Sequence, residues 1–193
     1  NYLSEFRQRS GLTMHLEHKA GEKLFVDFCG DKLSFVDEHS GEIIPVEVFV
    51  AILGCSQLTF VEAVLTQKKE DFISGCQHAF EYYGGATTAI VPDNLKAAVT
   101  KSSKYEPILN TTFETFAEHY STVILPARAY KPKDKALVEN AVKLVYQRIY
   151  TALADKVFTS LAALNQAILV ALELHNAAPL KQGESRRTLF EQE

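Results

Sequence analysis

Residues 23–29 read KLFVDFC, a strand-like run that is apolar on both faces apart from Asp27. Strands of this kind are typical of the middle of a sheet, where other elements cover both sides. We therefore predict a central strand here, followed by a bulge or bend at Gly30 and Asp31. A buried carboxylate that stays unpaired either destabilises the fold or loses its charge through a raised pKa. The presence of Asp27 in this strand therefore requires a compensating group.

The residues after this strand predict an antiparallel meander. Residues 33–37 (LSFVD) continue the strand, and residues 37–42 (DEHSGE) are typical of a hairpin turn. Two more apolar segments, 47–56 and 58–65, predict the second and third strands. The first half of the chain therefore predicts three antiparallel strands.

The second half alternates helices with short strands. Residues 68–85 have apolar side chains at helical spacing, and Gly84 and Gly85 predict the end of that helix. Residues 87–94 and 121–127 predict a fourth and a fifth strand. The other expected segments are a helix, a loop and a second helix within 95–120, a long helix over 133–153 with Val138, Val142, Val145 and Ile149 as its core stripe, a helix over 161–175 capped by Ser160, and a tail that is mostly loop.

This order of elements predicts the fold class. Three antiparallel strands followed by β-α units give an α/β protein with a mixed five-stranded sheet and helices on both faces. A chain of 193 residues with 47% hydrophobic content fits one domain with a substantial core. We expect a lead-in over residues 1–22, the core over 23–178 and a C-terminal extension over 179–193.

Composition excludes several classes of protein. There is no apolar run long enough for a membrane helix, and the polar N-terminus lacks the apolar core of a signal peptide. The three cysteines argue against a disulfide framework and fit a reducing cytoplasm. The net charge of −4 does not indicate a nucleic-acid binder. Because the chain begins with Asn1 rather than Met, we expect a fragment or a processed chain.

Three acids fall where the predicted topology can bring them together. Asp27 lies in the first strand, Asp93 at the carboxyl end of the fourth, and Glu139 near the start of the helix after the fifth. In a mixed sheet of this order, strands one and four are neighbours, and ligand sites lie at the carboxyl ends of strands. We therefore expect Asp27, Asp93 and Glu139 to converge.

Three carboxylates without soft ligands suit Mg²⁺ or Mn²⁺ rather than zinc. Two such ions about 3.5–4 Å apart can activate a hydroxyl on one side of a phosphate and stabilise the leaving oxygen on the other. Each acid alone has a plainer interpretation. Asp27 could be paired with a lysine, Asp93 could form a turn, and Glu139 could bridge Lys135 and Lys143 on an exposed helix face.

Basic residues concentrate around Glu139. Residues 128–148 include six basic residues and only two acids, Asp134 and Glu139. This local excess of positive charge is compatible with a phosphate-binding surface, and the plainer interpretation is a solvated helix face.

These residues also carry a resemblance to a known family. The motifs GEKLFVDFCG, VPDNLKAAV and YKPKDKALVENAV, with the closing pattern HNAAP…ESRRTLFE, resemble the IstA-type transposases of bacterial insertion sequences. More broadly, the order of elements and the three acids resemble the retroviral-integrase-type catalytic core of DDE transposases, which has a ribonuclease H-like fold. The resemblance covers roughly residues 15 to 193.

The resemblance implies a DDE-type polynucleotidyl transferase of the bacterial cytoplasm that cleaves DNA and transfers the free 3′ end. Asp27, Asp93 and Glu139 would be the catalytic residues and would bind two Mg²⁺ (or Mn²⁺) ions. The residues expected to bind DNA are Arg128, Lys131, Lys133, Lys135 and Lys143. The implied partners are the DNA of the element ends and of the target, further copies of the protein on that DNA, and an ATP-dependent helper protein.

Members of this family carry an N-terminal helix-turn-helix region and a C-terminal domain that act on DNA. We expect both to lie outside these 193 residues, which would explain the acidic charge balance. Two alternatives stay open at this point: a metal-dependent nuclease of the same fold, and a non-catalytic domain that binds nucleic acid or protein.

Overall fold

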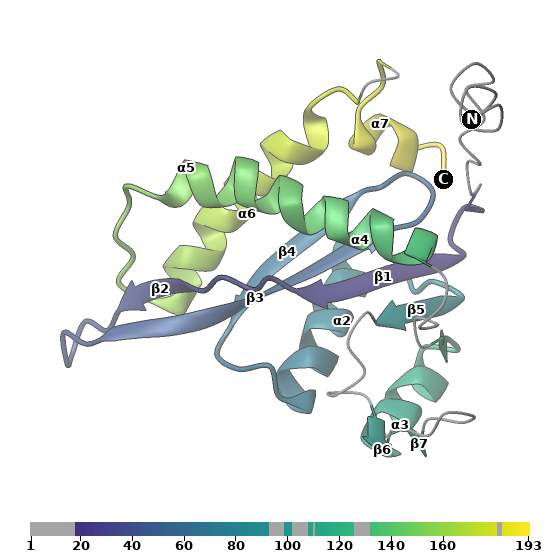
Figure 1. Ribbon diagram of the computed structural model, residues 1–193, viewed down its shortest axis with the longest axis horizontal. Helices are drawn as coiled ribbons and strands as arrows, with labels where there is room; N and C mark the ends of the chain where they lie inside the picture. The colour runs from purple at the N-terminus through teal and green to yellow at the C-terminus, as the bar shows by residue number, and fades with distance from the viewer. Residues whose placement is uncertain (1–17, 93–98, 102–107, 110, 126–131, 181–182) are drawn as a thin grey trace, which may run out of the picture.

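The computed structural model describes residues 18–92, 99–101, 108–109, 111–125, 132–180 and 183–193 (Figure 1). In this part of the chain, a six-stranded mixed sheet is formed by β1 (Lys23–Phe28), β2 (Leu33–Val36), β3 (Ile43–Leu53), β4 (Thr59–Val64), β5 (Ala89–Pro92) and β8 (Val123–Ile124). The helical segments are α2 (Lys69–Tyr83), α3 (Thr111–His119), α4 (Pro132–Val145), the π-helical turn η1 (Tyr146–Tyr150), α5 (Thr151–Leu153), α6 (Leu161–Ala177) and α7 (Arg186–Phe190). This is the predicted α/β class.

The long strand β3 organises the sheet. It pairs antiparallel with β2 near its start and with β1 near its end, while β4 pairs with its other edge. On the far side of β1, β5 runs parallel to it, and β8 runs parallel to β5. The predicted neighbourhood of the first and fourth strands is therefore confirmed. Residues 29–32 divide the predicted first strand into β1 and β2, which gives six strands instead of five.

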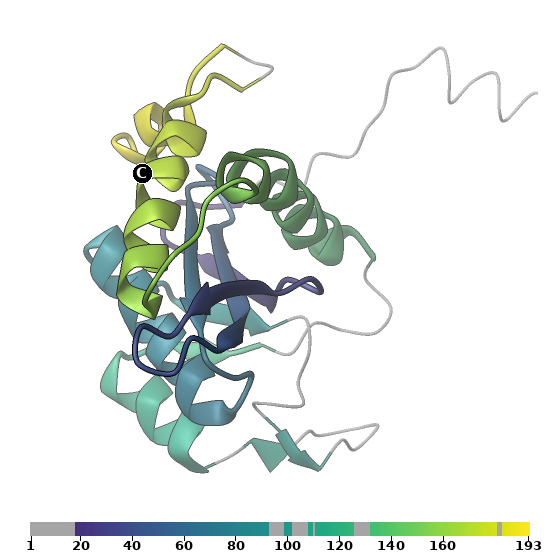
Figure 2. The same cartoon turned by 90° about the vertical axis from the view of Figure 1, so that its left-hand side faces the viewer.

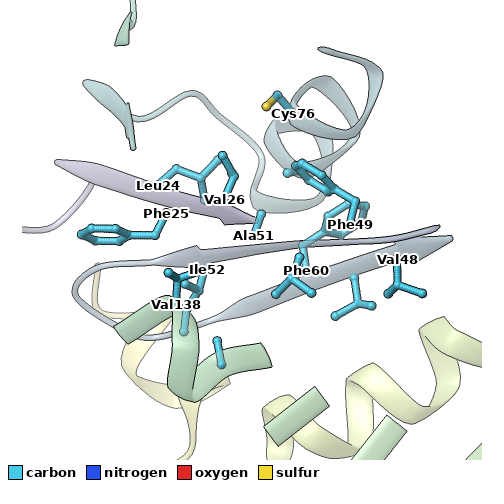
Figure 3. Packing of buried hydrophobic residues seen from close by; sticks show 14 of the residues in the cluster. Leu24, Phe25, Val26, Val48, Phe49, Ala51, Ile52, Phe60, Cys76 and Val138 are labelled. Carbon is cyan, nitrogen blue, oxygen red and sulfur yellow. The ribbon is translucent and has the colours of Figure 1, made fainter. Parts of the chain in front are cut away.

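Helices cover both faces of the sheet. Figure 3 shows Cys76 of α2 on one side of β1 and β3 and Val138 of α4 on the other. Leu24 and Phe49 are completely buried, as expected for central strands between two helical layers. The predicted core stripe is confirmed at Val138, Val145 and Ile149, which are at most 2% exposed.

Local signals in the sequence set several boundaries as predicted. The α2 helix ends at Gly84, whose φ of +76° is the left-handed conformation that glycine adopts without strain. Ser160 caps α6 by accepting a hydrogen bond from the backbone N–H of Ala163 over 3.1 Å. In the turn between β2 and β3, the carboxylate of Asp37 accepts hydrogen bonds from two backbone N–H groups, those of His39 and Ser40.

One expectation was wrong. The segment expected to be helical after residue 95 contains the strand β6 (Val99–Lys101), which pairs antiparallel with β7 (Ile108–Leu109). β-Branched residues at 99 and 100 favour such a strand over a helix. In Figures 1 and 2 this pair lies beside α3, far from α6 and α7.

The tail is mostly loop as expected, but it holds one short helix that was not predicted. It contains α7, which packs against α6 and begins at Ser185, whose side chain accepts a hydrogen bond from the N–H of Thr188 over 3.0 Å. The carboxylate of Glu193 accepts hydrogen bonds from the N–H groups of Gly21 and Ser56. The contacts of Glu193 hold the end of the tail against residues that are distant in the sequence. Such long-range contacts leave no periodic signal in the sequence. Among the described helices, none has the length and apolar character needed to cross a membrane.

Candidate catalytic site

Asp27 lies near the end of β1, opposite Val50 of β3, and its side chain is half-buried. Alternate residues of a strand point to the same face of the sheet, so Asp27 shares a face with Phe25. Phe25 pairs with Ile52, which lies on the same side of the sheet as Val138 of α4 in Figure 3. The sheet therefore directs Asp27 toward the layer that contains α4. Its Oδ1 accepts a hydrogen bond from the N–H of Phe28 over 2.8 Å.

The parallel strand β5 ends beside Asp27. Pro92, its last residue, pairs with Val26, and Val26 precedes Asp27 directly. Asp93 follows Pro92 in the sequence and lies outside the described residues. The register of β1 and β5 therefore brings the end of one strand, immediately before the second predicted acid, next to the first predicted acid.

Glu139 lies on α4, which packs against both β1 and β3. Its neighbour Val138 and Ala141 are each 2% exposed and form the buried side of the helix, whereas the Glu139 side chain is exposed. A carboxylate next to the buried stripe can face solvent while it stays close to the sheet. Lys143 is exposed one turn further along α4, on the same side as Glu139.

The other predicted DNA-binding residues cannot be placed in the same way. Lys133 and Lys135 belong to the first turns of α4, but their side chains lie outside the described part of the structure. Arg128 and Lys131 lie outside the described residues altogether. Their role as a phosphate-binding surface stays a prediction.

The side chains of the predicted acids fit a hard divalent cation. Asp27 and Glu139 offer carboxylate oxygens, which Mg²⁺ and Mn²⁺ prefer. Within the described residues, which do not include Asp93, there is no group of three His, Cys, Asp or Glu side chains that could hold a metal ion. Burial raises the pKa of the neighbouring Cys29 thiol to about 12, so the free thiol is protonated at neutral pH.

Two tyrosines that the sequence analysis did not single out contact the segment after β1. The N–H of Asp31 donates a hydrogen bond to the Tyr146 hydroxyl over 2.7 Å, and the Tyr150 hydroxyl donates to the carbonyl of Asp31 over 2.7 Å. The available signal was the spacing of two aromatic residues at i and i+4 in the motif YQRIY. Such spacing places both rings on one side of a helix.

A second polar cluster lies at the end of α6, around a pocket of about 270 Å³ that is lined in part by Arg148 and His175. His175 and Arg186 are 2% and 3% exposed. Burial and the charges of Arg186 and Arg148 lower the pKa of His175 to about 3, so its imidazole is neutral. Arg148 can only donate, so the Nδ1 of His175, 3.5 Å from its Nη1, accepts. The Nε2 of His175 has no hydrogen-bond partner in the described part of the chain.

No protein-family model matches the chain. Curated relatives do match it over nearly its whole length. A protein of Sinorhizobium fredii (strain NBRC 101917 / NGR234) named "Putative transposase y4bL/y4kJ/y4tB" is 45% identical over 191 residues, 98% of this chain and 37% of that protein. The "Putative transposase for insertion sequence IS1162" of Pseudomonas fluorescens is 42% identical over 180 residues, 93% of this chain and 32% of that protein. The chain thus spans about a third of the length of these relatives.

Solved structures show the same fold. The catalytic core domain of BIV integrase is similar with a TM-score of 0.63 and 12% sequence identity, over 89% of this chain and 95% of that one. The HTLV-2 integrase catalytic core domain in complex with magnesium is similar with a TM-score of 0.61 and 18% identity, over 89% and 97% of the two chains. At these identities the likeness establishes the fold alone.

Proposed function

From its kinship with the transposases of bacterial insertion sequences and its integrase-core fold, we propose that this chain is the catalytic core of a DDE-type transposase. Its substrates would be the DNA ends of the mobile element and a target DNA. The reaction would be cleavage of a phosphodiester bond, followed by attack of the freed 3′-hydroxyl on the target strand.

The pairing of β1 with β5 supports this proposal independently of the sequence similarity to transposases. It brings Pro92, which precedes Asp93 in the sequence, beside Val26, which precedes Asp27. The α4 helix packs on the same strand and carries the exposed Glu139. This arrangement supports Asp27, Asp93 and Glu139 as one group of carboxylates.

These three carboxylates would hold two divalent cations, Mg²⁺ or Mn²⁺, and the similar HTLV-2 core is described in complex with magnesium. When bound, the cations would supply activation of the attacking water or hydroxyl and stabilisation of the leaving oxygen. The carboxylates of the chain would orient the scissile phosphate, and the half-buried position of Asp27 in a central strand would keep one donor rigid.

The cations would also offset the electrostatic repulsion between the carboxylates of the site. Carboxylates that converge without a counter-charge repel one another, and bound cations remove that repulsion. On the exposed side of the group, Lys143 and the basic residues Arg128, Lys131, Lys133 and Lys135 would hold the DNA backbone without reading its sequence. Self-association on DNA and an ATP-dependent helper protein belong to the same proposal.

Metal binding by the chain itself tests the proposal. Mn²⁺ or Mg²⁺ should raise the Tm of the wild-type chain, because ions that bind only the folded state stabilise it. Asp27→Asn should remove most of that rise and leave the metal-free Tm unchanged or higher, since one repelling charge is lost. Asp155→Asn is a matched control, because Asp155 is an exposed acid just after α5.

Activity supplies the second measurement. The transposase that carries this chain should cut a duplex that ends in its own element sequence only when Mg²⁺ or Mn²⁺ is present, and it should join the freed 3′ end to a second duplex. Cleavage without any joining would favour the nuclease alternative. A normal metal response in Asp27→Asn would exclude Asp27 from the site.

A further inference from the structure

The helix that carries Glu139 does not continue as a regular α-helix. After Val145 it widens into the π-helical turn η1, Tyr146–Tyr150, before α5 resumes the α-helical geometry. π-Helical turns are rare in proteins, and those that occur are often found at functional sites. They change which side chains face a neighbouring element. In this chain the turn begins with Tyr146 and ends with Tyr150.

Both tyrosines bind one residue of the segment that follows β1. Asp31 donates its backbone N–H to Tyr146 and accepts from Tyr150 at its carbonyl, each over 2.7 Å. The two rings also contact each other, with centroids 4.7 Å apart. The wide turn therefore presents two hydroxyls that together satisfy both backbone groups of Asp31.

These contacts join the segments that directly follow β1 and α4, the two described elements that carry proposed acids. Asp31 lies four residues after Asp27, and Tyr146 lies seven residues after Glu139, about two helical turns along the same side of the helix. Asp31 lies three residues beyond the end of β1, and Tyr146 directly follows α4, so hydrogen bonds between these two segments limit how far α4 can slide along β1. A shift of α4 by one ångström would move Glu139 relative to Asp27 by a similar amount.

We infer that Tyr146 and Tyr150 are positioning residues, whose hydroxyl contacts with Asp31 set the place of Glu139 relative to Asp27. The inference rests on the proposed function, since it assigns the two tyrosines a role in holding the carboxylates at the spacing that divalent cations require. The tyrosines touch neither DNA nor the reacting atoms in this scheme. They act through the helix and the strand that they connect, as supporting residues do around other metal sites.

Removal of the two hydroxyls tests the inference. In Tyr146→Phe/Tyr150→Phe the rings stay, but the bonds to Asp31 are lost. The affinity for Mn²⁺, measured from the metal-dependent rise in Tm or by titration followed with electron paramagnetic resonance, should fall about tenfold. High Mn²⁺ concentrations should restore the full rise in Tm, because the carboxylates themselves are intact.

A matched control separates positioning from general stability. Tyr83 of α2 also donates its hydroxyl to backbone carbonyls, those of Ala51 and Leu58, but the helix that carries it does not hold Glu139. Tyr83→Phe should lower the metal-free Tm and leave the Mn²⁺ affinity unchanged. If the double variant also keeps wild-type affinity and only loses Tm, the tyrosines are structural and the inference is overturned.

The single variants Tyr146→Phe and Tyr150→Phe keep the test decisive if the double variant does not fold, because each should weaken Mn²⁺ binding by a smaller factor.

Failure of the proposed function gives a different result. A wild-type chain without any Mn²⁺ response, or an Asp27→Asn variant with a normal one, would overturn both the metal site and this inference. A normal wild-type response with unaltered tyrosine variants overturns the inference alone.

Discussion

Asn176 of α6 binds both backbone groups of Thr59 in β4. Its side-chain oxygen accepts from the N–H of Thr59 over 3.2 Å, and its side-chain nitrogen donates to the carbonyl over 2.7 Å. Asn165 forms the same pair of bonds with Ala63, over 2.7 and 2.9 Å. β4 pairs with β3 on one edge, and two asparagines of α6 take the place of a neighbouring strand on the other. Covering of this kind prevents an edge strand from pairing with another chain.

Replacement of Asn176 by Ala should therefore be strongly destabilising. Thr59 and Asn176 are both completely buried, so the substitution leaves two backbone groups without partners. We expect the free energy of unfolding to fall by about 2–4 kcal/mol, measured by chemical denaturation. Asn165→Ala should cost less, because Asn165 is only partly buried and water can replace its side chain. Equal effects of the two substitutions would contradict this explanation.

Gly75 is required by the packing of α2 on β3. A Cβ at this position would lie 2.9 Å from the ring of Phe49, which is itself completely buried. Alanine normally favours a helix over glycine by about 1 kcal/mol, but overpacking of the core costs about 1–3 kcal/mol. Gly75→Ala should thus lower the Tm. Gly85→Ala is the control, since its Cβ would meet open space and should change stability by less than about 0.5 kcal/mol.

The buried imidazole of His175 predicts a loss of stability in mild acid. Its pKa is lowered from 6.5 to about 3 in the folded chain, by burial and by the charges of Arg186 and Arg148. Below pH 6.5 the unfolded chain therefore binds a proton that the folded chain does not. The free energy of unfolding should decrease as the pH falls from 6.5 toward 3, by about 2 kcal/mol at pH 5.

Denaturation of His175→Gln at pH 7 and pH 5 checks this expectation. The variant lacks the titrating group, so its loss of stability between the two pH values should be smaller than that of the wild type. His39, exposed in the turn between β2 and β3, gives the control variant His39→Gln, which should keep the wild-type dependence. An unchanged pH dependence in His175→Gln would show that other groups cause it.

Glu139→Gln distinguishes a metal ligand from an exposed ion-pair residue. If the side chain only bridges lysines on a solvated face, the change should cost at most about 0.5 kcal/mol and leave activity intact. We expect instead that stability barely changes, while DNA cleavage by the transposase that carries this chain falls by orders of magnitude.

The lysine one turn further along α4 provides the comparison. Lys143→Ala should weaken DNA binding modestly for all sequences and reduce its salt dependence, because a phosphate contact is lost. Cleavage of bound DNA should stay near the wild-type rate. The assignment of Glu139 would be falsified if its Gln variant behaved like Lys143→Ala.

The sequence alone determined those features that depend on residues close together along the chain. Asp37 accepts hydrogen bonds from N–H groups two and three residues later, Gly84 ends α2 and Ser160 begins α6, each through backbone geometry of a few residues. The apolar run around Asp27 predicted a central strand, because apolar residues occupy both faces of the strand. In the same way the sequence predicted the elements that carry Asp27 and Glu139, a strand and a helix.

Only the tertiary structure decided how these elements meet. Asp31 and Tyr146 are 115 residues apart, and Thr59 and Asn176 are 117 residues apart. Such contacts depend on strand register, on the width of one helical turn and on the packing of helix against sheet, and none of these leaves a periodic signal. The same limit holds for the candidate site: the sequence predicted that the first and fourth strands are neighbours, but the register that sets Pro92 beside Val26 follows from packing. From the sequence alone, a polar residue such as Asn176 is expected at the surface, because its partner Thr59 is distant in the sequence and only the fold brings the two together.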